Sequence, residues 1–204
     1  MTHRLRAVAV VVVVLASALV AGCAASTPYY DYSKEPDPRN MEYVIGVADD
    51  LQINVWHQED LSTAAVVRPD GTITMPLIGD IKAAGRTTTE LRAEISQKMS
   101  KFIRDESAVV TVAITAVNSY SFTVAGNVEA PGVYNAHKYM NVAEAVAQAG
   151  GPNKFASPPG MVLIRQDHQT GKYRRIPINY DEIRSNKKPE ANLVLMPGDT
   201  VFLP

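Results

Sequence analysis

The first 23 residues constrain this chain most strongly, because they form an export signal that ends at a cysteine. Arg4 and Arg6 precede a predominantly apolar run over residues 7–20, which is typical of a secretory signal peptide spanning residues 1–22. The run is shorter than the ~20 apolar residues that a transmembrane helix needs. Cys23 is the only cysteine. The exported chain must therefore fold on its apolar core, without internal disulfide bonds.

Cys23 is also the candidate lipidation site. The small residues Ala21 and Gly22 stand directly before it, and this arrangement resembles a bacterial lipobox. Two or three acyl chains at such a cysteine attach a protein stably to a membrane, where one chain does not. The alternatives are a chance cysteine in an ordinary secretory signal and an uncleaved inner-membrane anchor. A lone thiol in an oxidising compartment argues against the first, and the short apolar run argues against the second.

Composition and charge limit the classes that remain. Cleavage after residue 22 leaves 182 of the 204 residues, enough for one large or two small domains. That part has 18 basic and 21 acidic residues, a net charge of −3, and so gives no sign of a basic face for nucleic acid. Residues 23–41 combine proline, serine, threonine and tyrosine without periodicity, and are expected to be a tether.

Periodicity and turn residues predict the first strands. Apolar residues alternate with polar ones over residues 51–55, as in a half-buried strand. Asp70 and Gly71 separate residues 66–68 from residues 72–75. Because glycine supplies the positive φ that tight hairpin turns need, these two residues predict a hairpin between the flanking segments.

Two helices are marked by capping boxes. Thr87 and Glu90 predict the start of one helix, and Asn141 and Glu144 predict the start of the other. The apolar stripe of the first helix is expected to comprise Leu91, Ile95, Met99 and Phe102. The inward side chains of the second are expected to be Val142, Ala145, Val146 and Ala149.

The remaining apolar segments are short and extended. Further strands are expected at residues 109–117, 120–124, 161–164, 173–178, 193–195 and 200–203. The fold class that follows is α+β, with two small β-rich domains that carry one helix each and join near Tyr120.

Catalytic and metal-binding patterns are missing from the sequence. The four histidines are scattered, and no zinc, nucleophile-elbow or phosphate-loop motif occurs. Asp49, Asp50, Glu59 and Asp60 could act as acid–base groups, but acids at strand ends more often cap turns. Trp56 and Tyr120 could stack on sugar rings, although such residues are more often core or interface. We therefore expect no catalytic residue, no metal and no cofactor.

Several segments resemble the bacterial outer-membrane polysaccharide export family. Residues 43–56 read Y-V-I-G-V-A-D-D-L-Q-I-N-V-W, and residues 66–81 read V-V-R-P-D-G-T-I-T-M-P-L-I-G-D-I, the most specific signature. With G-R-T-T-T-E-L at residues 85–91, these motifs match the family's polysaccharide export domain, expected over residues 42–118.

The second half resembles the soluble-ligand-binding β-grasp domain that follows in that family, expected here over residues 119–204. Its marks are V-A-G-N-V-E-A-P-G-V-Y at residues 124–134, A-G-G at 149–151 and M-P-G-D-T-V-F-L-P at 196–204. The turn residues expected from both halves are Asp70, Gly71, Gly79, Pro131, Gly132, Pro197, Gly198 and Asp199.

The resemblance implies a non-enzymatic component of capsule or exopolysaccharide export. Such a protein is a lipoprotein of the outer membrane that faces the periplasm and forms a homo-oligomeric ring or conduit. It would receive polysaccharide from an inner-membrane copolymerase and pass it to a separate outer-membrane β-barrel. The sequence stops at Pro204 with one β-grasp domain and no pore helix, so this chain is expected not to cross the membrane itself.

Two other functions remain open at the level of sequence. One is a monomeric periplasmic lipoprotein that binds a glycan or a small ligand. The other is a periplasmic glycosidase or lyase that uses the acids named above. Oligomeric size separates the ring from the monomer, and activity on the polymer separates the enzyme from both.

Overall fold

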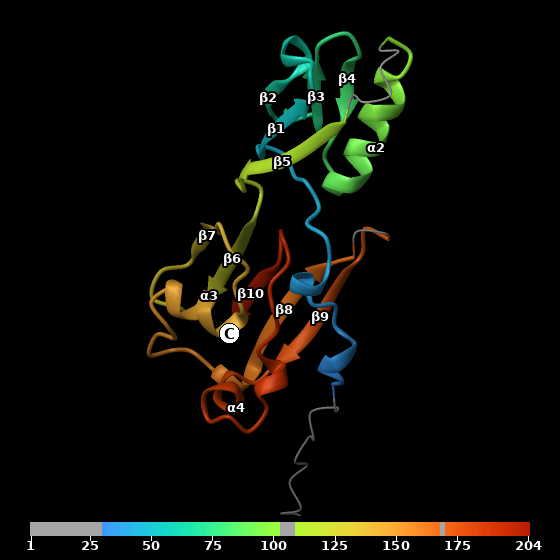
Figure 1. Ribbon diagram of the computed structural model, residues 1–204. Helices are drawn as coiled ribbons and strands as arrows, with labels where there is room; N and C mark the ends of the chain where they lie inside the picture. Colours follow the sequence, from blue (N-terminus) through green and yellow to red (C-terminus); the bar gives the residue numbers. More distant parts are fainter. Residues whose placement is uncertain (1–29, 103–108, 168–169) are drawn as a thin grey trace, which may run out of the picture. The chain divides into compact units, whose positions relative to one another are not determined.

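The computed structural model describes residues 30–102, 109–167 and 170–204 (Figure 1). The signal peptide and Cys23 lie outside these residues, so their predictions stand as expectations. The described part begins with two 3-10 helices, η1 (Tyr32–Lys34) and η2 (Pro38–Asn40), in the segment expected to be a tether.

Residues 50–116, which we call the first domain, combine a three-stranded sheet, a hairpin and one long helix. Its elements are β1 (Asp50–Val55), η3 (Glu59–Leu61), β2 (Thr63–Val66), β3 (Thr72–Met75), β4 (Gly79–Lys82), α2 (Thr88–Met99) and β5 (Val110–Ala116). Strand β1 pairs antiparallel with β2 and β5, and β3 pairs antiparallel with β4. Helix α2 packs along β5 (Figure 1). Apolar side chains from all these parts meet in one buried core.

The predicted capping box of α2 is confirmed. The Thr87 side chain accepts a hydrogen bond from the Glu90 backbone, and the Glu90 side chain accepts one from the Thr87 backbone. The stripe is buried as expected up to Met99, but Phe102 is exposed and the prediction for it is wrong. The helix ends at Met99, and the backbone N–H of Phe102 then bonds to the Met99 carbonyl at 2.8 Å. That tighter i to i+3 turn rotates Phe102 off the stripe.

The Asp70–Gly71 turn forms, but the flanking strands pair elsewhere. The backbone N–H of Arg68 donates to the Thr72 carbonyl at 2.9 Å, and Gly71 has a φ of 77°. Beyond this closure β2 pairs with β1, while β3 pairs with β4. The predicted pairing of the segments on either side of the turn is therefore wrong. A turn residue fixes only the local reversal of the chain, whereas the partner of each strand depends on distant residues.

The described residues from 121 onward, which we call the second domain, form a mixed five-stranded sheet with helices. Its elements are β6 (Ser121–Gly126), β7 (Gly132–Asn135), α3 (Val142–Gln148), η4 (Pro158–Gly160), β8 (Met161–Gln166), β9 (Tyr173–Ile178), α4 (Tyr180–Arg184), η5 (Pro189–Ala191) and β10 (Thr200–Leu203). The strand order is β7-β6-β10-β8-β9. Strands β6 and β10 are parallel, and the other neighbours are antiparallel. The expected α+β class is confirmed.

Helix α3 has the capping box and the buried residues that the sequence predicts. Two details differ. Helix α4 was not expected, and its start is capped by the Asn179 side chain. Residues 193–195 are not a strand, because only Val194 bridges to Asn141 there. A run of three apolar residues marks burial without fixing a pairing partner.

Candidate functional site

Asp49 anchors the start of β1. Its side chain is buried, and Oδ2 accepts hydrogen bonds from the backbone N–H of Gly46 and the hydroxyl of Tyr43, both at 2.8 Å. Ser119 donates its backbone N–H to Oδ1 at 2.8 Å and its hydroxyl to Oδ2 at 2.9 Å. The backbone N–H of Asn118 donates to Oδ1 at 2.8 Å. Five donors thus occupy this carboxylate, which suits a structural anchor and leaves little capacity for acid–base chemistry.

The second buried aspartate, Asp199, anchors the start of β10. Its Oδ2 accepts from the backbone N–H of Met196 at 2.8 Å and from Nη2 of Arg165 at 2.7 Å. Nε of Arg165 lies 3.1 Å from both carboxylate oxygens. Burial raises the pKa of Asp199, and the hydrogen bonds from Arg165 oppose that rise.

The two aspartates close the same kind of turn. In each turn the first residue's N–H donates to Oδ2 of the aspartate, three residues later. The residue before the aspartate has a positive φ, 73° at Ala48 and 82° at Gly198. Pro197 precedes Gly198, as the sequence motif has it. The two domains therefore introduce a strand with equivalent turns, although the first uses an alanine where glycine is favoured.

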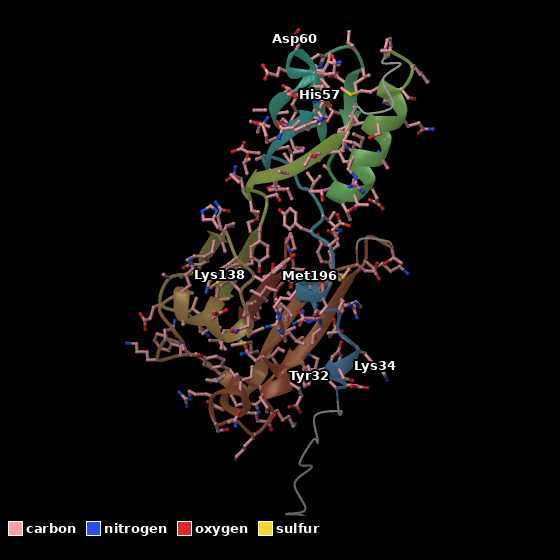
Figure 2. All side chains as sticks on the ribbon, viewed as in Figure 1. Tyr32, Lys34, His57, Asp60, Lys138 and Met196 are labelled. Carbon is pink, nitrogen blue, oxygen red and sulfur yellow. The ribbon has the colours of Figure 1, made fainter. Side chains whose placement is uncertain are left out.

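Arg165 extends the second anchor to the N-terminal segment. It sits at an inward position of β8, is 2% exposed, and its Nη1 lies 3.3 Å from Oε2 of Glu35. Glu35 Oε1 also pairs with Nη1 of Arg174 at 3.1 Å. The hydroxyl of Tyr32, which is labelled in Figure 2, donates to the Pro177 carbonyl at 2.7 Å. The described end of the expected tether thus packs against β8 and β9.

Sequence reasoning missed the pairing of Glu35 with Arg165, although a signal was present. Met161, Leu163 and Arg165 alternate along β8 with their side chains buried. A charged residue at an inward position of such a strand requires a buried counter-charge. The sequence does not say where in the chain that counter-charge lies.

The four candidate acids do not form one site. Asp49 is buried among its donors, and its neighbour Asp50 is half-buried at the start of β1. Glu59 and Asp60 lie exposed in η3 (Figure 2). The structure gives no convergent acid pair among them.

The two candidate aromatic residues have opposite surroundings. Trp56 is 63% exposed, and its ring lies beside the ring of His57 with centroids 4.9 Å apart. Tyr120 is buried, donates to the Leu195 carbonyl at 3.1 Å and accepts from the Met140 N–H at 3.0 Å. Burial also raises the pKa of Tyr120. Only Trp56 presents a ring to a ligand.

The other turn residues lie as follows. The Asp70 side chain accepts a hydrogen bond from the Thr72 N–H at 3.0 Å and so shapes the turn. Gly79 closes the β3–β4 hairpin with a φ of 70°. Pro131 ends the β6–β7 connection, and Gly132 is the first residue of β7, paired with Val124.

Neither a metal cluster nor a membrane span is found within the described ranges. No group of three or more His, Cys, Asp or Glu residues is placed there to hold a metal ion. A search of the same ranges finds no helix that is long and apolar enough to cross a membrane.

Two family models match the chain in succession. The polysaccharide biosynthesis/export protein model matches residues 37–115, and the SLBB domain model matches residues 121–177. The first match covers β1 to most of β5, and the second covers β6 to most of β9.

Curated relatives match over parts of their length. The chain is 32% identical over 183 residues to the EPS I polysaccharide export outer membrane protein EpsA of Ralstonia nicotianae, covering 78% of this chain and 46% of that protein. It is 30% identical over 125 residues to the exopolysaccharide production protein ExoF of Rhizobium meliloti, covering 55% and 29%. It is 26% identical over 179 residues to the capsule polysaccharide export protein BexD of Haemophilus influenzae, covering 78% and 43%. The chain thus spans less than half of each of these relatives.

Proposed function

Because this chain belongs to the bacterial polysaccharide export proteins, we propose that it serves polysaccharide export as a non-enzymatic component. The observation that carries the proposal is the succession of an export domain and an SLBB domain in one chain. The surroundings of Asp49 and Asp199 support the non-enzymatic role, since both carboxylates are occupied by structural donors.

We also propose a cellular location and an oligomeric state for this protein. We infer that Cys23 carries a lipid anchor in the outer membrane, with the two domains in the periplasm. Copies of the chain form a homo-oligomeric ring or conduit. This ring receives polysaccharide from an inner-membrane copolymerase and passes it to a separate outer-membrane β-barrel. The location in the outer membrane is supported by the similarity to EpsA, an outer membrane protein, and by the lipobox-like sequence.

Deletion of the gene tests the role in export. Surface polysaccharide should disappear while the genes of precursor synthesis remain intact, and the wild-type gene should restore it. Alanine variants of Asp50, Glu59 and Asp60 should also restore it at wild-type protein level, because no reaction depends on them. Normal surface polysaccharide in the deletion strain would refute the proposal. An export defect in one of these variants at normal protein level and assembly would favour the enzyme.

The anchor and the ring are tested separately. Cys23→Ser should abolish palmitate labelling and membrane fractionation, since the acceptor is the thiol. A variant that labels and sediments like the parent would contradict the lipoprotein assignment. Native mass spectrometry of the purified protein should give a closed oligomer. A strict monomer that binds glycan would instead support the alternative, a periplasmic glycan- or ligand-binding lipoprotein.

A further inference from the structure

One face of the β2–β1–β5 sheet points away from the core, and from Gln52 to Trp56 it carries no charged side chain, although the carboxylate of Asp50 lies on the same side at the start of β1. We call this uncharged part the outer face; its residues are Gln52, Asn54, Trp56, Ala64, Thr111 and Ala113. Alternate residues of a strand point to the same side, and the intervening residues of β1, Leu51, Ile53 and Val55, are buried. The outer face therefore lies opposite the apolar core.

The strand register places these residues in adjacent rows. Gln52 lies between Ala64 on β2 and Ala113 on β5. Asn54 lies opposite Thr111, and its Oδ1 accepts a hydrogen bond from Nε2 of Gln52 at 3.1 Å. Small alanines flank Gln52 on both sides, and Thr111 lies beside Asn54, so no bulky side chain stands next to the two amides on the neighbouring strands.

Trp56 lies at the end of this surface. Its backbone N–H bonds to the Val109 carbonyl at 2.9 Å, which continues the pairing of β1 with β5 by one residue. Trp56 is 63% exposed, and its ring lies beside the ring of His57, which is labelled in Figure 2. An indole face carries partial negative charge and attracts the weakly positive C–H groups of a sugar ring.

We propose that the outer face is a contact surface for uncharged, hydroxyl-rich stretches of a polysaccharide, with Trp56 as the stacking platform; this inference rests on the proposed function. Amide and hydroxyl side chains both donate and accept hydrogen bonds, as sugar hydroxyl groups do. Because no ion on the face must lose its hydration, a neutral chain can bind and leave at little cost. Weak contacts of this kind suit a polymer that must be released again during export.

The composition argues against a subunit interface as the occupant. Cores of protein interfaces are enriched in aromatic residues, methionine and arginine. Apart from Trp56, the outer face holds amides, alanines and a threonine, and the exposed valines Val66 and Val109 stand only at its two ends. A subunit interface is therefore the competing outcome of the test and not the expected one.

Binding is measured on the purified full chain with cellohexaose, a neutral oligosaccharide, by ligand-observed NMR. Trp56 is the only tryptophan, so its fluorescence reports the same event. Trp56→Ala should remove binding. Gln52→Glu should weaken it about two- to tenfold, the loss expected for one or two hydrogen bonds. Gln97→Glu is the matched control, an exposed amide on α2 of the same domain, and should bind normally. No binding by the wild type, or equal binding by all four proteins, overturns the inference.

Complementation of the deletion strain separates this inference from the proposed function. If the wild type and Gln97→Glu restore surface polysaccharide, and Trp56→Ala and Gln52→Glu at equal protein level do not, both proposals are supported. If all four proteins restore surface polysaccharide equally, the proposed role of the outer face is refuted while the export role stands. If a strain without the gene still exports, the proposed function fails by itself. If Trp56→Ala and Gln52→Glu lose the oligomer but bind cellohexaose normally, the face is a subunit interface and the inference is wrong.

Discussion

The buried carboxylate of Asp49 gives the sharpest test of the physical argument. Asp49→Asn keeps the shape of the side chain and replaces one acceptor oxygen with a donor group. The amide has one favourable orientation, with its nitrogen at the Oδ2 position. There the hydroxyls of Tyr43 and Ser119 can rotate and accept, but the backbone N–H of Gly46 cannot. The opposite orientation would leave two backbone donors unpaired.

The loss of folding free energy in Asp49→Asn follows from the hydrogen bonds that are lost or weakened. One buried N–H without an acceptor costs about 1–3 kcal/mol. The two remaining backbone bonds change from charge-assisted to neutral, which costs about 1 kcal/mol each. Burying a neutral amide in place of a carboxylate returns part of this loss. The free energy of unfolding of the first domain should therefore fall by about 2–4 kcal/mol, a large fraction of the usual 5–15 kcal/mol or so.

Urea denaturation followed by Trp56 fluorescence measures the effect, because the only tryptophan lies in the first domain. Asp50→Asn is the matched control. Its side chain is half-buried, and its carboxylate accepts one long bond of 3.5 Å from Asn118. The control should change the free energy of unfolding by less than about 0.5 kcal/mol. If Asp49→Asn proves as stable as Asp50→Asn, the anchor has been assigned wrongly.

Three further outcomes are expected. Gly71→Val should cost about 1–2 kcal/mol of folding free energy and so lower the melting temperature, because Gly71 has a φ of 77° and an added Cβ would lie 2.9 Å from Cβ of Ala84. Gly132→Val, without such strain, is the control, and equal melting temperatures of the two variants would contradict the turn. Arg165→Met should destabilise the second domain by about 3–5 kcal/mol in thermal unfolding, since the buried Asp199 loses its cation and the buried Glu35 loses one of the arginines that pair with it. The half-exposed Arg174→Met should cost far less, and similar losses would refute the buried cluster. Stability should decline as the pH rises above about 10, because burial raises the pKa of several tyrosines in the folded state while the unfolded chain ionises at the ordinary value. A melting temperature that stays flat in that range would count against their burial. The tyrosines whose pKa is raised are Tyr32, Tyr43, Tyr120 and Tyr139.

The local features of the fold could be predicted from the sequence. Both capping boxes form, because the groups that bond lie three residues apart and need only the first turn of a helix. The alternation at residues 51–55 and the buried residues of α3 are confirmed, because periodicity reports which side of an element avoids water. Phe102 is the exception, since the stripe continued in the sequence after the helix had ended.

Strand partners and buried polar contacts were decided by the tertiary structure. The residues around Asp70 and Gly71 indicate a turn, yet β2 pairs with β1, because pairing depends on which apolar faces meet across the whole domain.

The candidate site likewise combines features that the sequence predicts with contacts that only the folded chain reveals. The sequence identified aspartates at strand starts. It did not reveal that Ser119, 70 residues from Asp49, completes one anchor, or that Glu35, 130 residues from Arg165, completes the other. A sequence pattern shows that a group is buried, but only the folded chain brings its partner within the roughly 3 Å of a hydrogen bond.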